Sequence, residues 1–143
     1  MPLEPGNSPG FLLWHATLRW QRELAAALDP LGLTHVQFVL LACAWWLNTK
    51  GVQPNQLTLS QQAGIDVKMT SQVLRALEDK GLIERHTDPL DTRAKRLHVT
   101  DRGAALAPRA IEVVEQVDHA FFHPALSAGN LQFLRELARH GER

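Results

Sequence analysis

The chain has 143 residues, of which 45% are hydrophobic, and this is enough for one compact domain with an ordinary core. Fifteen basic side chains balance fifteen acidic ones. The net charge therefore points to neither nucleic acid nor a membrane as partner, and any electrostatic binding surface has to be local. The longest apolar run, FVLLACAWWL, has ten residues and is too short to span a membrane.

The cysteine content and the first residues indicate a cellular compartment. The single cysteine, Cys43, excludes an internal disulfide. The opening stretch, MPLEPGNSPG, contains neither a charged leader nor an apolar signal core. Both features favour a reducing environment, and we expect the protein in the cytoplasm.

The first half of the chain is predicted to be helical. Apolar periodicity indicates a long helix from Pro9 to the DPLG stretch, where proline and glycine interrupt it. Thr34 and Gln37 have the spacing of a capping box, which predicts a second helix that runs to about Asn48. A short helix capped by Asn55 or Thr58 follows, and the GI dipeptide after it predicts a tight turn.

The second half adds a hairpin between helices. A capped helix is predicted over 67–80. The β-capable runs LIERHT (82–87) and AKRLHVT (94–100) are joined by a charged turn and predict a hairpin. A long helix capped by Thr100 or Asp101 and a last helix over 130–140 complete the chain. We therefore predict a mainly α fold with a small β-wing, in the element order of a winged helix-turn-helix.

The helix predicted over 67–80 has two different faces. The polar face consists of Lys68, Ser71, Gln72 and Arg75. The apolar side is predicted to consist of Met69, Val73, Ala76 and Leu77. Any amphipathic surface helix has this pattern, but hydroxyl, amide and basic groups also match base edges and phosphates in a major groove. The preceding short helix and turn favour the DNA-binding interpretation.

Three segments resemble the MarR family, the multiple-antibiotic-resistance type of winged-helix repressor. They are LGLTHVQFVLL, VKMTSQVLRALEDKGLIER and DPLDTRAKRLHVTDRG, of which the last is the most specific. The resemblance covers nearly the whole chain and implies one MarR-like domain over 1–143. It implies a winged helix-turn-helix DNA-binding lobe at 34–100 and a helical dimerisation region formed by 9–29 and 101–143.

The resemblance also implies roles for individual side chains. Ser71, Gln72 and Arg75 belong to the major-groove helix, and Arg93, held by Asp91, enters a minor groove. A carboxylate beside a guanidinium orders it through charge-assisted hydrogen bonds, so less entropy is lost on binding a narrow A·T groove. The full set predicted to contact DNA comprises Lys68, Thr70, Ser71, Gln72 and Arg75 on the helix and Asp91, Arg93, Lys95 and Arg96 on the wing.

The function implied is that of a sequence-specific regulator of transcription on double-stranded DNA. The family implies a ligand-responsive repressor that binds a pseudo-palindromic operator as an obligate homodimer. A winged-helix protein-interaction module without sequence-specific DNA binding is the alternative, and steep salt dependence on duplex DNA would separate the two. The sequence contains no HExxH, GxSxG, P-loop or paired-carboxylate signature, so we expect no enzyme activity.

An aromatic group suggests an effector site. In the family, small aromatic or amphipathic ligands bind where the first two helices meet the DNA-binding lobe. A basic side chain could hold an anionic group there while a tryptophan stacks on its ring. The candidate residues are Trp14, His15, Arg19, Trp45 and Trp46, for which core and dimer packing is the alternative role. We expect no cofactor besides such an effector.

Two further features are expected to be structural. Peroxide-sensing members of the family use an N-terminal cysteine hydrogen-bonded by tyrosines, whereas Cys43 lies midway along a helix and the chain has no tyrosine. His119 and His123 have i, i+4 spacing and could share a metal ion with Asp118. No third ligand motif is evident, so a solvated or packing role is expected for both histidines and no metal site is predicted.

Overall fold

The computed structural model describes residues 4–91, 93–125 and 127–139. The elements in chain order are the short 3-10 turn η1 (Pro5–Asn7), α1 (Pro9–Leu28), the turn η2 (Asp29–Leu31), α2 (His35–Thr49), α3 (Gln56–Ala63), α4 (Val67–Asp79), β1 (Ile83–Thr87), β2 (Lys95–Val99), α5 (Asp101–Phe122) and α6 (Ala128–Ala138). This order confirms the predicted mainly α fold with a two-stranded wing.

The helices begin where local capping groups predict. The hydroxyl of Thr34 accepts a hydrogen bond from the N–H of Gln37, and the Gln37 side chain accepts one from the N–H of Thr34, both at 3.2 Å. Asn55 caps α3 and Asp66 caps α4 through side-chain oxygens 2.8 Å from main-chain nitrogens. Thr100 caps α5. Each cap satisfies N–H groups that lack a partner within the first turn of the helix.

The last helix differs from its predicted range. It begins at Ala128 because the hydroxyl of Ser127 accepts a hydrogen bond from the N–H of Asn130 at 3.2 Å. Asn130 therefore lies inside the first turn instead of starting the helix. The predicted end at His140 lies outside the described residues.

The wing is an antiparallel pair whose register runs from Ile83 opposite Val99 to Thr87 opposite Lys95. The outer edge of β2 is covered as well. The N–H of Leu97 donates to the carbonyl of Pro54 at 2.8 Å, and the Asn48 side chain accepts from the N–H of Val99 at 2.8 Å. These bonds fix the wing to the last turn of α2 and to the segment that follows it, so the hairpin does not stand alone.

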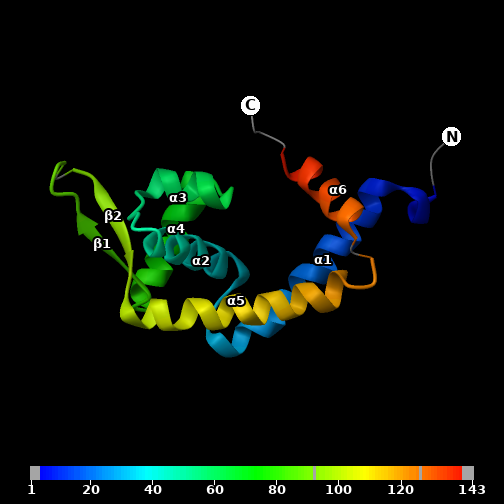
Figure 1. Ribbon diagram of the computed structural model, residues 1–143, viewed down its shortest axis with the longest axis horizontal. Coiled ribbons are helices and arrows are strands. Elements are labelled where there is room, and N and C mark those ends of the chain that lie inside the picture. The colour runs from blue at the N-terminus through cyan, green and yellow to red at the C-terminus, as the bar shows by residue number, and fades with distance from the viewer. Residues whose placement is uncertain (1–3, 92, 126, 140–143) are drawn as a thin grey trace.

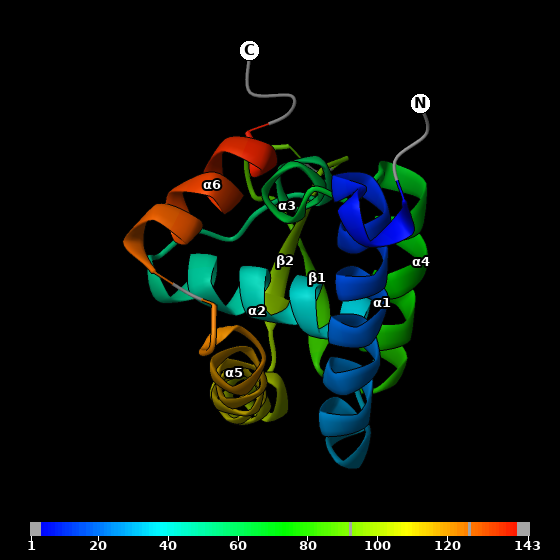
Figure 2. The same cartoon turned by 90° about the vertical axis from the view of Figure 1, so that its right-hand side faces the viewer.

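The buried core lies in the helix-turn-helix lobe and between it and the adjoining parts of α1 and α5. Its largest members are Leu28, Leu40, Leu41, Leu59, Leu74, Leu77, Ile83 and Leu97. Helix α5 runs along one side of this lobe and continues past it, so that the wing and α6 lie near opposite ends of the molecule (Figure 1). Figure 2 looks nearly along α5 and places the lobe and α6 on the same side of it.

One prediction about α4 is wrong. Met69 was expected on the apolar, core-facing side, but 43% of its surface is exposed. The buried stripe consists of Thr70, Val73, Leu74 and Leu77, which follow i, i+3, i+4 and i+7 spacing. Met69 therefore lies beside the polar face and not beneath it.

Candidate nucleic-acid interface

The turn between α3 and α4 fixes how α4 is presented. Gly64 adopts a left-handed conformation with φ of 70°, which glycine tolerates without steric cost. The N–H of Ile65 then donates back to the carbonyl of Ser60 at 3.1 Å. The side chain of Gln56, at the start of α3, donates to the carbonyl of Val67 at 3.3 Å. The first turn of α4 is thus held to α3 from two sides.

The polar face of α4 is directed outward. Lys68, Gln72 and Arg75 are exposed, and Ser71 is partly buried between them and the core. Thr70 departs from the prediction, because it is fully buried and its hydroxyl donates to the carbonyl of Ile65 at 3.5 Å. A side chain inside the core cannot reach a base edge, so the predicted DNA contact of Thr70 is wrong. Thr70 instead stabilises the turn between α3 and α4.

The tip of the wing carries the predicted pair of Asp91 and Arg93. One carboxylate oxygen of Asp91 accepts from the main-chain N–H of Arg93 at 3.1 Å and from its guanidinium Nε at 3.4 Å. The side chain of Arg93 is 92% exposed. The carboxylate thus orients a guanidinium that projects from the tip, as the resemblance implied.

Arg96, which was also predicted to contact DNA from the wing, is paired with a carboxylate of the loop. Its guanidinium contacts Asp88 Oδ2 from Nε at 3.0 Å and from Nη2 at 2.9 Å. Asp88 is buried and also accepts from the N–H of Leu90 at 2.8 Å. The hydrogen bonds from Leu90 and then from Arg96 hold the pKa of Asp88 below its ordinary value. Arg96 therefore braces the loop, while its side chain stays partly exposed and its DNA contact stays a prediction.

This brace depends on pH in a definite direction. A carboxyl group with a lowered pKa in the folded state adds stability above its ordinary pKa and loses that stability as the pH falls through the lowered value. The pairing of Asp88 with Arg96 is consequently complete at neutral pH. Lys95, the remaining basic residue predicted to contact DNA from the wing, is exposed and donates to the hydroxyl of Thr87 at 3.0 Å.

A clamp that sequence analysis missed joins the wing to the helix-turn-helix. Arg85 on β1 forms an ion pair with Glu78 near the end of α4, and its Nη1 donates to Gln56 Oε1 at 3.4 Å. One guanidinium therefore contacts α3 and α4 from the wing. The hairpin pattern contained a signal for this clamp. Arg85 lies directly opposite the buried Leu97, at a position where a strand packed on a core would carry an apolar residue.

A second missed contact joins α4 to the start of α2. Lys80 Nζ donates to the carbonyl of Gly32 at 2.6 Å and to Gln37 Oε1 at 2.7 Å. The same Gln37 oxygen accepts the N–H of Thr34 in the capping box. The orientation of α4 is thereby coupled to the turn that separates α1 from α2.

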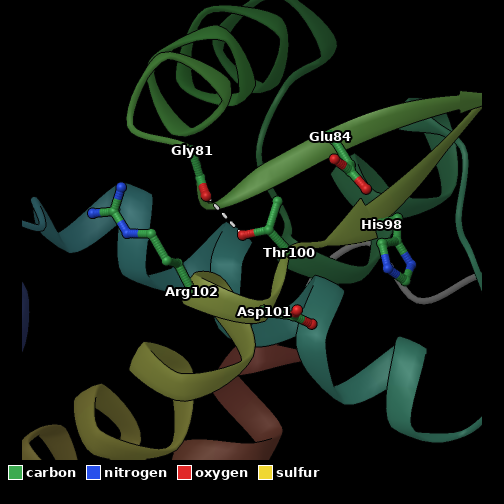
Figure 3. A pocket seen from close by; sticks show the side chains of 6 residues that line it. All are labelled: Gly81, Glu84, His98, Thr100, Asp101 and Arg102. Atoms are coloured by element: carbon green, nitrogen blue, oxygen red, sulfur yellow. Dashed lines mark hydrogen bonds between the residues drawn. The ribbon is translucent and has the colours of Figure 1, made fainter.

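The base of the wing meets α5 beside a polar cavity of about 350 Å³ (Figure 3). The hydroxyl of Thr100 donates to the carbonyl of Gly81 at 2.6 Å and closes one wall. Glu84 and Asp101 place carboxylates around the opening, together with His98 and Arg102. Within the described ranges, no group of three or more His, Cys, Asp or Glu side chains is arranged to hold a metal ion. The cavity lies where the base of the wing packs against the start of α5.

Comparison with known proteins decides the family. The model described as MarR family matches residues 33–95. The HTH-type transcriptional regulator YdcH of Bacillus subtilis (strain 168) is 42% identical over 137 residues, which cover 95% of this chain and 93% of YdcH. The chain belongs to the MarR family. The HTH-type transcriptional repressor Rv2887 of Mycobacterium tuberculosis is 31% identical, with 92% of each chain covered.

Solved structures of low sequence identity share the fold of this MarR-family chain. CouR from Rhodococcus jostii RHA1, bound to p-coumaroyl-CoA, matches with a TM-score of 0.83 at 23% identity, covering 96% of this chain and 94% of CouR. MepR of S. aureus, in complex with DNA, matches with a TM-score of 0.81 at 20% identity, covering 93% and 96%. MarR-family proteins are transcriptional regulators and not enzymes.

For a MarR-family wing, Arg93 and Lys95 should have separable effects on DNA binding. Arg93→Ala is expected to weaken binding to operators flanked by A·T pairs more than to those flanked by G·C pairs, because a guanidinium in a minor groove responds to its width and potential. Asp91→Ala should reproduce part of that loss, since it leaves Arg93 unordered. Lys95→Ala should weaken all duplexes alike. Titrations with exchanged flanks check this, and equal losses for Arg93→Ala on every flank would contradict minor-groove insertion.

Two of the predicted effector residues in this MarR-family chain are exposed tryptophans on different helices. Trp14 is 62% exposed on α1, and Trp46 is half exposed on α2, where Lys50 lies over its ring at 5.7 Å. An apolar cavity of about 310 Å³ lies instead between α1, α5 and α6. Its lining consists of Leu13, Ala16, Thr17, Trp20, Phe121, Phe122 and Leu134. Of the predicted set, Arg19 is adjacent to this cavity, because its guanidinium stacks over Phe121 at 4.9 Å.

Trp20, the one tryptophan of the aromatic group that was not named as a pocket residue, lines this cavity. Its indole Nε1 donates to Asp118 Oδ1 at 2.8 Å, and its ring meets the His35 imidazole edge-on at 5.2 Å. Burial lowers the pKa of His35, and the nearby carboxylate of Asp118 partly opposes that shift. This cluster joins α1, α2 and α5 where the lobe meets the long helices.

The remaining candidates have structural surroundings. Burial raises the pKa of the Cys43 thiol, which disfavours the reactive thiolate. The rings of His119 and His123 lie 5.0 Å apart, while the Asp118 carboxylate is engaged by the indole of Trp20. Among the described residues, no single helix is long and apolar enough to cross a membrane; the first two helices meet that test only as a pair bent by 70°.

Proposed function

We propose that this MarR-family regulator is a cytoplasmic repressor that binds a pseudo-palindromic operator as a homodimer. The observation that carries the proposal is the joint presentation of two DNA-reading elements. Helix α4 directs Gln72 and Arg75 outward, and the wing projects an oriented Arg93 from the same lobe. Two-fold symmetry would place two such lobes about 34 Å apart along one face of the duplex. Competition between operator and unrelated duplex tests the proposal.

The homodimer rests on apolar surface at the far end of the molecule. The exposed side chains there are Phe11, Leu12, Leu13 and Trp14 on α1 and Leu131, Phe133 and Leu137 on α6. Exposed apolar side chains in this number are costly in water, and covering them contributes roughly 25 cal/mol per Å². A second copy of the same two helices offers a matching apolar surface.

The oligomeric state should respond to a charge on α6. The native chain is expected to sediment as a dimer at micromolar concentration, whereas Phe133→Asp should weaken the dimer at least about tenfold, because a carboxylate would be buried at the interface. Leu90→Asp is the matched control, since Leu90 is exposed on the wing, away from the base. A folded monomer of the native chain at micromolar concentration would contradict the proposed assembly.

We further propose that an aromatic effector binds in the cavity between α1, α5 and α6. Its volume of about 310 Å³ is at the small end of the range for ligand sites, and its walls are apolar and aromatic. Arg19 lies over Phe121 at the cavity wall and can pair with a carboxylate. A ligand bound there would contact α1 and α5 and change their relative position. These two helices would set the spacing of the two DNA-binding lobes.

The effector proposal predicts linked changes in fluorescence and DNA affinity. Benzoate should quench tryptophan fluorescence and weaken operator binding together, because an effector must bind two conformations unequally to act. Arg19→Ala should abolish the response to benzoate, whereas Arg22→Ala, on the exposed side of the same helix, should leave it unchanged. Titrations with benzoate and phenol that never alter operator affinity would reduce the cavity to a packing feature.

A further inference from the structure

An apolar side chain is exposed at the edge of the polar face of α4, beside the proposed DNA contacts. Met69 is 43% exposed and lies one helical turn before Gln72 on the flank of that face. The fold does not require it there, because the buried stripe of α4 is complete without it. Single exposed apolar side chains are common on protein surfaces, but this one lies beside side chains that match base edges, where an apolar group of the DNA can contact it.

The backbone holds Met69 in a defined place. Its N–H donates to the Asp66 carboxylate at 2.8 Å, so Met69 is the third residue of α4 and lies in the first helical turn. The N-terminal residues of a recognition helix are the ones that approach base edges in the major groove. Gln72 follows three residues later, and side chains at this spacing are neighbours with Cβ atoms about 5–6 Å apart.

The major groove offers one apolar group, the C5-methyl of thymine. Successive base pairs are about 3.4 Å apart, so two neighbouring side chains on a helix can contact adjacent pairs. A flexible, polarisable thioether adapts its shape to such a methyl group. Neither Lys68 nor Gln72 can supply this contact, because both end in strongly hydrated polar groups.

We propose that Met69 packs against the C5-methyl group of a thymine in each operator half-site, next to the base pair that Gln72 contacts. The inference rests on the proposed operator binding and adds a specificity residue to it. Met69 then distinguishes thymine from cytosine by an apolar contact, while Gln72 distinguishes its base by hydrogen bonds. The half-site should contain a thymine at one fixed step from the position sensitive to Gln72.

Replacing thymine by uracil tests this directly, because it removes the methyl group and leaves the hydrogen-bonding edge unchanged. The probe is the duplex that the native chain selects from a random library, with each thymine replaced singly by deoxyuridine. At one thymine per half-site, the replacement should weaken binding about fourfold, the value expected for loss of one buried methyl group. Met69→Ala should bind the thymine and uracil duplexes equally at that position.

Two variants separate the contact from a general loss of binding. Met69→Leu keeps an apolar side chain and should retain most of the uracil penalty. Gln72→Ala should bind more weakly overall and still show the penalty. If no thymine methyl matters, or if Met69→Ala keeps the full penalty, the inference is overturned while operator binding stands. If the library yields no preferred sequence, the proposed function itself fails.

Discussion

Gly103→Ala is expected to lower the free energy of unfolding by about 3 kcal/mol, the upper end of the usual cost of overpacking a core. A Cβ at Gly103 would overlap the carbonyl oxygen of Leu82 and lie 2.7 Å from Val99 Cγ1. The carbonyl cannot move away without losing the hydrogen bond that it accepts from the N–H of Thr100 at 3.1 Å. The clash falls where the wing, α4 and α5 meet, so the loss should affect the whole lobe.

Urea unfolding followed by circular dichroism measures this effect, with Gly10→Ala as the matched control. Gly10 is also a helical glycine, but nothing lies within 4 Å of a Cβ placed there. Alanine at that position should be neutral or stabilise slightly, because glycine is the poorer helix former. Equal midpoints for Gly103→Ala and the native chain would show that α5 does not pack on the wing as described.

Gln72→Ala is expected to cost ~1–3 kcal/mol on the operator and almost nothing on unrelated DNA. Gln72 is exposed on the outer face of α4, and a terminal amide can form two hydrogen bonds to an adenine edge. Losing both removes discrimination between bases but leaves the phosphate contacts in place. The variant should therefore bind the operator about five- to 150-fold more weakly.

Lys95→Ala provides the contrast for Gln72→Ala. Lys95 is exposed on the wing, where phosphates would pass, so its removal should weaken operator and unrelated duplex alike and flatten the slope of log K against log salt by about one unit. Binding assays on both duplexes over a salt series compare the two variants. If Gln72→Ala lost the same affinity for both duplexes, Gln72 would contact the DNA phosphates and not a base.

Most of the fold was predictable because its boundaries are set by local chemistry. The capping box of Thr34 and Gln37, the cap at Asp66 and the turn at Gly64 each depend on residues within a few positions of one another. Such pairs can be found from spacing alone. The alternation of the two wing strands is equally local, and their predicted ranges differ from the structure by one or two residues.

The features that sequence analysis missed depend on long-range contacts. Lys80 contacts the carbonyl of Gly32, 48 residues away, and no local pattern announces that bond. The tryptophans show the same limit, because apolar periodicity could not indicate that Trp20 lines a cavity and Trp14 is exposed. Arg96 pairs with the buried Asp88 across the loop, a specific partner that the charge pattern alone did not identify.

The exposed side of α4 shows why even a clear helical pattern is ambiguous at its edges. A stripe of four buried residues covers less than half of the helix surface, so a flanking position such as Met69 can belong to either side. Only the packing of α4 against α2 and α3 decides which. The DNA contacts predicted at Lys68, Ser71 and Arg75 have accessible side chains and stay predictions.

The most direct test of the account is the salt dependence of binding by the native chain to its selected operator and to a scrambled duplex. A DNA-reading dimer should bind the operator at least about 10³-fold more tightly. Its log K should fall with log salt at a slope steeper than about −4, since each phosphate neutralised contributes about −0.9. Weak binding with a shallow slope and no preference between the duplexes would contradict the account and favour a winged helix that contacts another protein.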